Sequence, residues 1–376
     1  MKKTLILICF LALVSGCVYP YDFPLPDEEQ YPLVIDGTII LGQNSRIRIT
    51  YLQAIEESNA TYPSSADVVL EAENGSTYTF FRENSGYYFL NSSSLPGTEK
   101  YRLKIDCDNN TYYSEWLQAM ETPVIKKLEI VSNGIDVLPQ ISVDASSGEG
   151  YVAIHFQEKW KFHADYAIHY LYDPETNKVS PLDNPIEDYY WCYAKRIVEN
   201  EQIVDCRSMN GIMENYPVAK WPCSNKRFHT SYTIRTYVRN MTEQEYRYRK
   251  LLNDNTQAGG DLFTPEPGEM AGNIYCENDS NISVYGYVNI SASVMQDATT
   301  DGRFYVYENP KGLTKVDPDF YINYYNNGYK PLDVVYQSGG GNYVGWGTRR
   351  CYDCTAEGGS KEPVYFDDET PYGLDY

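Results

Sequence analysis

Residues 241–257 read MTEQEYRYRKLLNDNTQ and carry the one strong helix signal in a chain that otherwise reads as strands and turns. Thr242 is a favourable N-cap residue, because its hydroxyl can accept a hydrogen bond from a backbone N–H of the first turn. Glu245 stands three residues later, so its carboxylate can reach back to the Thr242 N–H and complete a capping box. Met241 and Tyr246 are placed to form a hydrophobic staple. These signals predict that a helix begins at Thr242.

The apolar side chains of this segment predict how the helix packs. Tyr248, Leu251 and Leu252 fall at positions i, i+3 and i+4 and therefore share one face. The proline-containing run at 261–267 cannot continue a helix, so we expect one helix over about 242–256. Its apolar face should pack on a β-rich domain. Replacing both leucines by Asp should unfold that domain.

Residues 31–122 show short strands separated by turn residues at regular spacing. Seven segments have the alternation, or the β-branched and aromatic content, that is typical of strands. These segments are residues 33–40, 46–51, 67–72, 77–81, 86–90, 100–105 and 111–116. This density of strands predicts an N-terminal immunoglobulin-like β-sandwich.

One turn in this region, DCDNN at residues 106–110, resembles the start of a calcium-binding loop. Thr111 and Leu117 stand at the positions where such a loop needs a Gly and a bidentate Glu. We therefore expect a plain hairpin turn there, without a metal ion.

Residues 123–376 are predicted to form a larger β-rich domain into which the helix is inserted. Strand patterns occur at residues 151–156, 165–172, 191–194, 228–238, 282–293 and 303–307. The rest of the C-terminal region is irregular, and its loops are rich in Tyr and Gly. The chain holds 38 tyrosines, which suit half-buried strand faces and also sugar- or peptide-binding surfaces.

The first 16 residues have the form of a bacterial lipoprotein signal peptide. Two lysines precede an apolar run that is too short to span a membrane, and Val14-Ser15-Gly16-Cys17 has the form of a lipobox. We expect cleavage before Cys17 and attachment of acyl chains such as palmitate, which would anchor the protein in the outer membrane. The Pro-rich, acidic residues 17–30 read as a tether. An ordinary secretory signal with a chance cysteine is the alternative.

The net charge of −21 and the pI near 4.6 restrict the partners of the chain. Nucleic acid and anionic membrane surfaces both need a basic protein surface, so we expect neither as an electrostatic partner. The lipid anchor is then the expected membrane attachment.

Seven cysteines remain after Cys9, in the signal peptide, and Cys17 are set aside. The pair Cys351-x-x-Cys354 lacks the strand-to-helix setting of a redox dithiol and the second Cys or His pair of a zinc site. We expect a structural disulfide, either within this pair or to Cys192. The others are Cys107, Cys206, Cys223 and Cys276, and an odd count leaves at least one free thiol.

No catalytic, metal-binding or cofactor motif is recognisable in the sequence. A nucleophile elbow, a His-Glu-x-x-His helix and a phosphate-binding loop are absent. His155, His163 and His169 do not have a diagnostic metal-ligand spacing. We therefore expect no enzyme, no metal and no cofactor. A glycosidase needs only a pair of carboxylates without a fixed sequence signature, so a secreted glycan-active hydrolase stays an alternative.

Several segments together resemble the Bacteroidota lipoprotein family called domain of unknown function 4249, or DUF4249. They are the strand LVIDG at 33–37, the triplet WCY at 191–193, the block 245–286 with its GDLFTPEP and GNI segments, and the terminal CYDC at 351–354 followed by Gly358, Gly359 and Pro363. The chain departs from the family at its end. Glu357 replaces the usual Arg before the glycine pair, and an acidic tail replaces the usual Asp-Phe-Trp.

The resemblance implies an outer-membrane lipoprotein, often encoded near TonB-dependent receptors, and it brings no catalytic residues. We therefore expect a lipid-anchored, surface-facing protein that acts as a non-catalytic binding or accessory subunit of a TonB-dependent nutrient transporter. Its ligand would be a glycan, a peptide or another small nutrient. A surface adhesin or structural protein is a further alternative.

Overall fold

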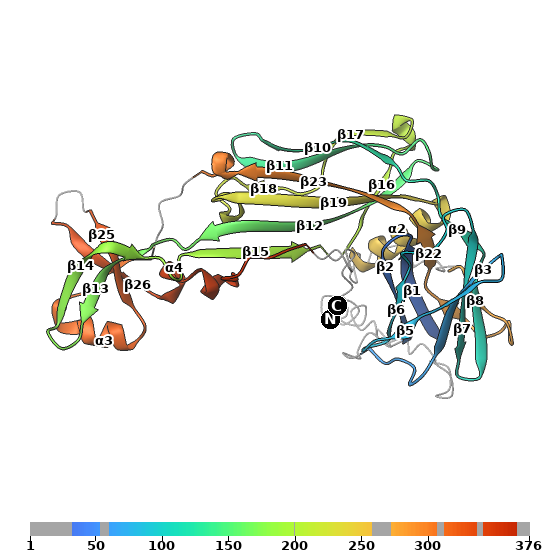
Figure 1. Ribbon diagram of the computed structural model, residues 1–376, viewed down its shortest axis with the longest axis horizontal. Helices are drawn as coiled ribbons and strands as arrows, with labels where there is room; N and C mark the ends of the chain where they lie inside the picture. Colours follow the sequence, from blue (N-terminus) through green and yellow to red (C-terminus); the bar gives the residue numbers. More distant parts are fainter. Residues whose placement is uncertain are drawn as a thin grey trace, which may run out of the picture.

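The computed structural model describes residues 32–52, 60–198, 200–257, 272–306, 312–336 and 341–366. The predicted signal peptide, Cys17 and the tether lie outside these residues. Three β-rich parts follow one another along the long axis: an N-terminal sandwich, a central sandwich and a distal lobe (Figure 1). The expectation of a mainly β protein with one prominent helix is confirmed. Among the described residues, no helix has the length and apolar character needed to cross a membrane.

The N-terminal sandwich packs two six-stranded sheets face to face. One sheet contains β1 (Leu33–Ile40), β2 (Asn44–Tyr51), β5 (Phe81–Arg82), β6 (Tyr87–Asn91), β21 (Val284–Tyr285) and β22 (Val288–Ser291). The other contains β3 (Asp67–Ala72), β4 (Thr77–Thr79), β7 (Lys100–Cys107), β8 (Asn110–Ser114), β9 (Leu117–Gln118) and β20 (Ile274–Cys276). Alternate apolar side chains of these strands form a continuous core, as the alternation in sequence predicts.

Three strands of this sandwich come from residues 274–291, which the sequence reading assigned to the second domain. Strand β20 pairs with β8, and β21 and β22 run parallel to β1. Gly286 lies between β21 and β22 at φ 104°, and a Cβ there would come within 2.0 Å of the Ile35 carbonyl oxygen. The sandwich is therefore not confined to residues 31–122, because a distant segment returns to complete both sheets.

The central sandwich packs a second pair of sheets. The first sheet contains β10 (Val124–Ser132), β11 (Asp136–Asp144), β17 (Ile212–Pro217) and β18 (Trp221–Pro222). The second contains β12 (Tyr151–His163), β15 (Trp191–Ile197), β16 (Gln202–Asp205), β19 (Ser231–Met241) and β23 (Ser293–Asp301). Apolar side chains of both sheets, among them Ile141, Ile154 and Ile234, form a second core.

The distal lobe lies at the far end of the molecule from the N-terminal sandwich (Figure 1). It contains the hairpin β13 (Ile168–Asp173) with β14 (Lys178–Ile186), and the sheet β24 (Thr314–Lys315), β26 (Tyr343–Gly347) and β25 (Lys330–Val335). Two short helices, α3 (Tyr321–Asn326) and α4 (Arg349–Tyr352), complete it. Much of the region expected to be irregular loops is therefore a small folded unit.

Helix α2 (Glu243–Gln257) confirms the predicted helix to within one residue at each end. The Thr242 hydroxyl accepts from the Glu245 N–H at 3.1 Å, so the cap forms, and Tyr246 packs against the apolar cluster that contains Met241, as the predicted staple requires. The Glu245 carboxylate points inward and accepts from Arg239 instead of completing the capping box.

The prediction for the apolar face of α2 is only partly right. Tyr248 is buried and its ring stacks on Tyr287 at a centroid distance of 5.3 Å. Leu251 is half-buried, whereas Leu252 is 36% exposed. Much of the buried face is occupied by charged groups, which leaves Leu252 at the solvent boundary. A Leu252→Asp substitution is accordingly expected to leave the fold intact.

The buried face of α2 carries an ion-pair network that we call the arginine joint, formed by Arg239, Glu201, Glu245 and Arg249. The Arg239 guanidinium donates to Glu245 at 2.7 and 3.0 Å and to Glu201 at 2.6 and 2.8 Å. Arg249 donates to Glu245 at 3.0 Å and to the Thr38 hydroxyl at 3.1 Å. Because Thr38 lies on β1 and Arg239 on β19, the joint connects the two sandwiches.

Burial makes the charges of the arginine joint depend on one another. The side chains of Arg239 and Glu245 are fully buried, and Asn289 of β22 also donates to Glu245. Burial alone would raise the pKa of Glu201, but the adjacent Arg239 charge holds it at about 2. Burial also raises the pKa of the nearby Asp36 carboxyl of β1. An unpaired member of this network would be costly.

Candidate functional site

The disulfide of the described chain joins Cys192 of β15 to Cys354, across a sequence separation of 162. Of the two pairings expected for Cys354, the alternative with Cys192 is the one present, and the bond within the Cys351-x-x-Cys354 pair is not. Cys351 is a free, buried thiol on α4 that packs with Ile168 and Leu332 instead. The two cysteines of the pair therefore enter different apolar clusters, and the bond fastens the C-terminal segment to the central sheet.

The distal lobe has an aromatic core. Trp346 of β26 is fully buried, with Tyr321 stacked on it at 5.0 Å and Tyr172 at 5.5 Å between ring centroids. Tyr325 of α3 contacts Tyr172 at 5.2 Å. Many of the tyrosines that suggested a binding surface in the sequence thus pack against one another inside the lobe.

Three apolar side chains of the lobe, Tyr325 among them, are substantially exposed to solvent. Phe320 is 54% exposed, Ile322 is 40% exposed and Tyr325 is 41% exposed. All three lie on α3 or directly before it, and we call them the distal patch. The sequence reading missed them, although the run FYINYY at residues 320–325 is a local concentration of large apolar side chains. Ile322 and Tyr325 stand three residues apart on α3 and so share one face of the helix, and contiguous exposed apolar side chains mark interaction surfaces.

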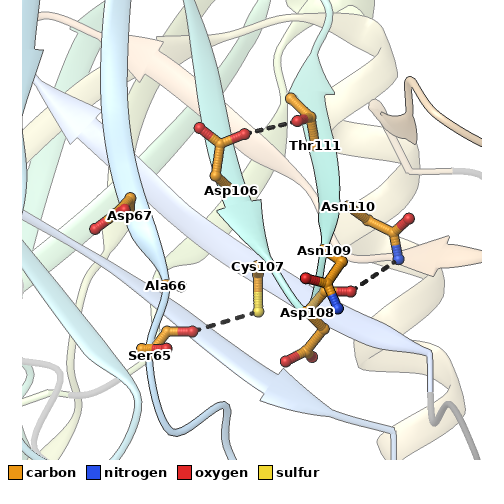
Figure 2. A pocket seen from close by; sticks show the side chains of 9 residues that line it. All are labelled: Ser65, Ala66, Asp67, Asp106, Cys107, Asp108, Asn109, Asn110 and Thr111. Carbon is orange, nitrogen blue, oxygen red and sulfur yellow. Dashed lines mark hydrogen bonds between the residues drawn. The ribbon is translucent and has the colours of Figure 1, made fainter.

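A polar pocket of about 500 Å³ lies at the end of the N-terminal sandwich (Figure 2). It is lined by Ser65, Ala66, Asp67, Asp106, Cys107, Asp108, Asn109, Asn110 and Thr111. The turn between β7 and β8 consists of Asp108 and Asn109, at φ 51° and 62°. Two successive left-handed residues are typical of a type I′ hairpin. The predicted hairpin turn is therefore confirmed.

The groups around this pocket already have partners. Asp106 accepts from Lys104 at 2.8 Å and from Thr111 at 2.6 Å, and these hydrogen bonds hold its pKa below the usual range. Tyr51 donates to Asp108 at 2.7 Å. Burial raises the pKa of the Cys107 thiol to about 12, so it stays protonated and is a poor nucleophile. The pocket can accept polar groups but offers no activated reactant.

The histidines considered in the sequence do not gather around one point. His155 is buried in the middle of β12, His163 lies at the end of that strand, and His169 is exposed on β13. His163 stacks instead on His229, with ring centroids 4.0 Å apart. Burial, and then the charges of His163 and Lys226, lower the pKa of His229 to about 3. In the described residues no group of three or more His, Cys, Asp or Glu side chains could hold a metal ion.

The most buried carboxylate of the central sandwich, Glu158, is held by interior side chains. It accepts from Trp221 at 2.9 Å and from Tyr232 at 2.6 Å. The Arg227 guanidinium packs between Trp160 and Trp221 beside it, at 4.4 and 3.7 Å from the ring centroids. Glu158 therefore belongs to a packed interior cluster.

Residues 18–298 match the family described as Domain of unknown function (DUF4249). The matched range contains the N-terminal sandwich, helix α2 and all but the last residues of the central sandwich. No curated protein matches the chain. Because the match spans well over half of the sequence, the chain belongs to the DUF4249 family.

Proposed function

We propose that this protein is an outer-membrane lipoprotein that serves as a non-catalytic binding or accessory subunit of a TonB-dependent nutrient transporter. The observation that carries the proposal is the exposure of the distal patch on α3, which lies at the end of the molecule opposite the N-terminal sandwich (Figure 1). A chain anchored through Cys17 enters the fold at β1 in that sandwich. The sandwich would then face the membrane side, and the distal patch would be presented to a partner.

The surface of the lobe supports binding better than it supports hydrolysis. Exposed aromatic and aliphatic side chains supply contact area at a low cost in conformational entropy. The hydrolase alternative needs two facing carboxylates in an accessible cleft. Among the described residues, the most buried carboxylates, Glu158 and Glu245, have interior partners. The binding role is therefore the one that we carry forward.

The lipid anchor predicts the behaviour of a Cys17→Ser variant. The thiol is the acyl acceptor, so the variant should incorporate no alkyne-labelled palmitate, and most of the protein should leave the outer-membrane fraction. One acyl chain alone binds a membrane only weakly, and loss of all chains removes the anchor. Metabolic labelling and membrane fractionation measure both effects. A Cys107→Ser variant, which keeps the lipobox, is the matched control. Unchanged labelling of the Cys17→Ser variant would refute lipidation at this residue.

The distal patch predicts the result of a co-purification experiment. A Phe320→Ser, Ile322→Ser variant should lose the transporter during purification from outer membranes in mild detergent, whereas the wild-type protein should retain it. Loss of two exposed anchors at an interface typically weakens binding by about tenfold or more. Phe81→Ser with Ile135→Ser is the matched control, since these residues are 66% and 75% exposed on other parts of the molecule.

Two results of this experiment would count against the proposal. Wild-type protein that is purified without any TonB-dependent receptor would contradict the proposed association with a transporter. Equal recovery of the receptor with both double variants would show that the distal patch is not the contact surface. Circular dichroism of each variant establishes that the fold is retained.

A further inference from the structure

The sheet of the central sandwich that contains β12 and β15 carries a cluster of lysines on its outer face. Lys159 and Lys161 lie on β12 and Lys195 on β15, and their side chains point away from the core formed by Ile154 and Ile234. In the register of the sheet Lys159 stands directly opposite Lys195. We call these three residues the lysine strip.

The lysine strip stands out in a chain of net charge −21. Among the described residues none of its three ammonium groups has a carboxylate partner. Five lysines elsewhere in the described chain do have one: Lys104 pairs with Asp106, Lys126 with Asp144, Lys127 with Glu129, Lys220 with Asp136 and Lys226 with Glu357. Like charges directly opposite in a sheet destabilise it. Lys161 does lie over the rings of Trp191 and Tyr193, at 4.8 and 5.8 Å from their centroids, so the repulsion across the sheet comes from the Lys159–Lys195 pair.

A segment of the protein's own chain lies next to the lysine strip and shows which kind of peptide can pack there. The segment after Cys354 begins as a short 3-10 helix (Cys354–Glu357), and Ser360 then exchanges backbone hydrogen bonds of 2.7 and 2.8 Å with Tyr193 of β15. The ring of Phe366 then lies 4.4 Å from the Lys159 ammonium and 4.5 Å from the Arg235 guanidinium. A segment of the chain that pairs with β15 at one residue and carries an aromatic side chain thus already packs at one edge of the strip.

We propose that the lysine strip is the docking site for an extended acidic segment of a partner protein. Alternate side chains of an extended peptide lie about 7 Å apart on one face. Lys159 and Lys161 have the same separation in sequence, and Lys195 widens the strip by one strand. Two carboxylates of such a peptide would meet two or three ammonium groups at once. This inference does not depend on the lipid anchor or on the distal patch.

The negative net charge of the protein favours the binding of a short acidic protein segment over the binding of a larger polyanion. At physiological salt, charges interact over about 8 Å. A short acidic segment can lie within that distance of the strip and away from the acidic remainder of the surface. A membrane or a nucleic acid extends well beyond it and meets the repulsion of the remaining charge of −21.

The test uses the full-length protein and a fluorescein-labelled peptide, Phe-Glu-Val-Glu-Val-Glu, with its Gln analogue as the comparison. We expect the acidic peptide to bind in fluorescence anisotropy and the Gln peptide not to bind. A Lys159→Gln, Lys161→Gln, Lys195→Gln variant should weaken binding by about tenfold. Lys126→Gln, Lys127→Gln, Lys220→Gln is the matched control, because it removes the same charge from lysines that have partners, and it should bind as the wild type does.

Three results would overturn the proposal. The first is absence of peptide binding, or equal binding by both triple variants. The second is peptide binding that appears only after residues 367–376 are removed, which would make the acidic sequence of this chain the occupant. The third is stronger binding of phosphatidylglycerol vesicles or single-stranded DNA than of the peptide to the same lysines. As an independent measurement, Lys195→Gln should keep or raise the melting temperature, and a fall would assign the lysine to the fold.

Discussion

Loss of the Cys192–Cys354 disulfide is expected to lower the free energy of unfolding by about 5 kcal/mol. The bond spans 162 residues, so in the chain-entropy account it removes a large closed loop from the unfolded ensemble. A bond within the Cys351-x-x-Cys354 pair would contribute only about 2 kcal/mol in the same account. The variant is Cys192→Ser with Cys354→Ser, and the measurement is urea unfolding followed by far-ultraviolet circular dichroism.

Reductant supplies a direct control for this prediction. Dithiothreitol should destabilise the wild-type protein toward the level of the double variant and should leave the double variant itself unchanged. A Cys351→Ser variant should remain sensitive to reductant, because it keeps the bond. If wild type and double variant unfold at the same urea concentration without reductant, the bond does not constrain the unfolded chain.

Replacement of Arg239 by Met is the second substitution expected to have a large effect, about 3 to 5 kcal/mol of lost stability. Arg239 is fully buried and pairs with both Glu201 and Glu245, so the substitution leaves two carboxylates without their main partner. Arg247→Met is the matched control, since Arg247 is 75% exposed and pairs with Glu243 on the same helix. That exposed pair should contribute under about 1 kcal/mol.

The pH dependence of stability gives the Arg239 prediction a second measurement. The pKa of Glu201 is about 2 in the folded protein, against an ordinary value of 4.5. Its ion pair therefore stabilises the wild type fully above about pH 4.5, and this contribution is lost as the pH falls toward 2. Arg239→Met should lose that part of the acid dependence. Restoration of stability by Glu245→Gln in the same variant would support stranded charge as the cause, and a loss below 1 kcal/mol would contradict it.

Local signals predicted those parts of the fold that depend on neighbouring residues. The start of α2 follows from Thr242 and Met241, whose cap and staple act within one turn. The hairpin at Asp108 likewise follows from two residues that tolerate left-handed backbone. Strand alternation similarly indicated most strands of the N-terminal sandwich. In each case the deciding interaction lies within a few residues along the chain.

Features that depend on distant partners were not predictable in this way. The inward turn of Glu245 requires Arg239 and Asn289 to be in place, and the sequence alone does not show that Leu252 lies at the solvent boundary. The choice of Cys192 over Cys351 as the partner of Cys354 depends on how the distal lobe packs. The apolar run at residues 320–325 is visible in the sequence, but which of its side chains are exposed is not, because similar neighbours such as Tyr321 are partly buried.

The return of β20, β21 and β22 to the N-terminal sandwich has a consequence for how the chain can fold. After β9 the chain forms β10 to β12 of the central sandwich, the hairpin β13–β14 of the distal lobe, and then β15 to β19 of the central sandwich. It next completes the N-terminal sandwich with β20 to β22. It ends with β23 of the central sandwich and β24 to β26 of the distal lobe. Each of the three parts is thus built from segments that are far apart in the sequence, and none is a continuous piece of it. Their cores close only when late strands arrive, so folding depends on long-range closure and should be slow. A fragment that ends at residue 122 would lack β20, β21 and β22, so its core would stay exposed and it would not be an independent domain.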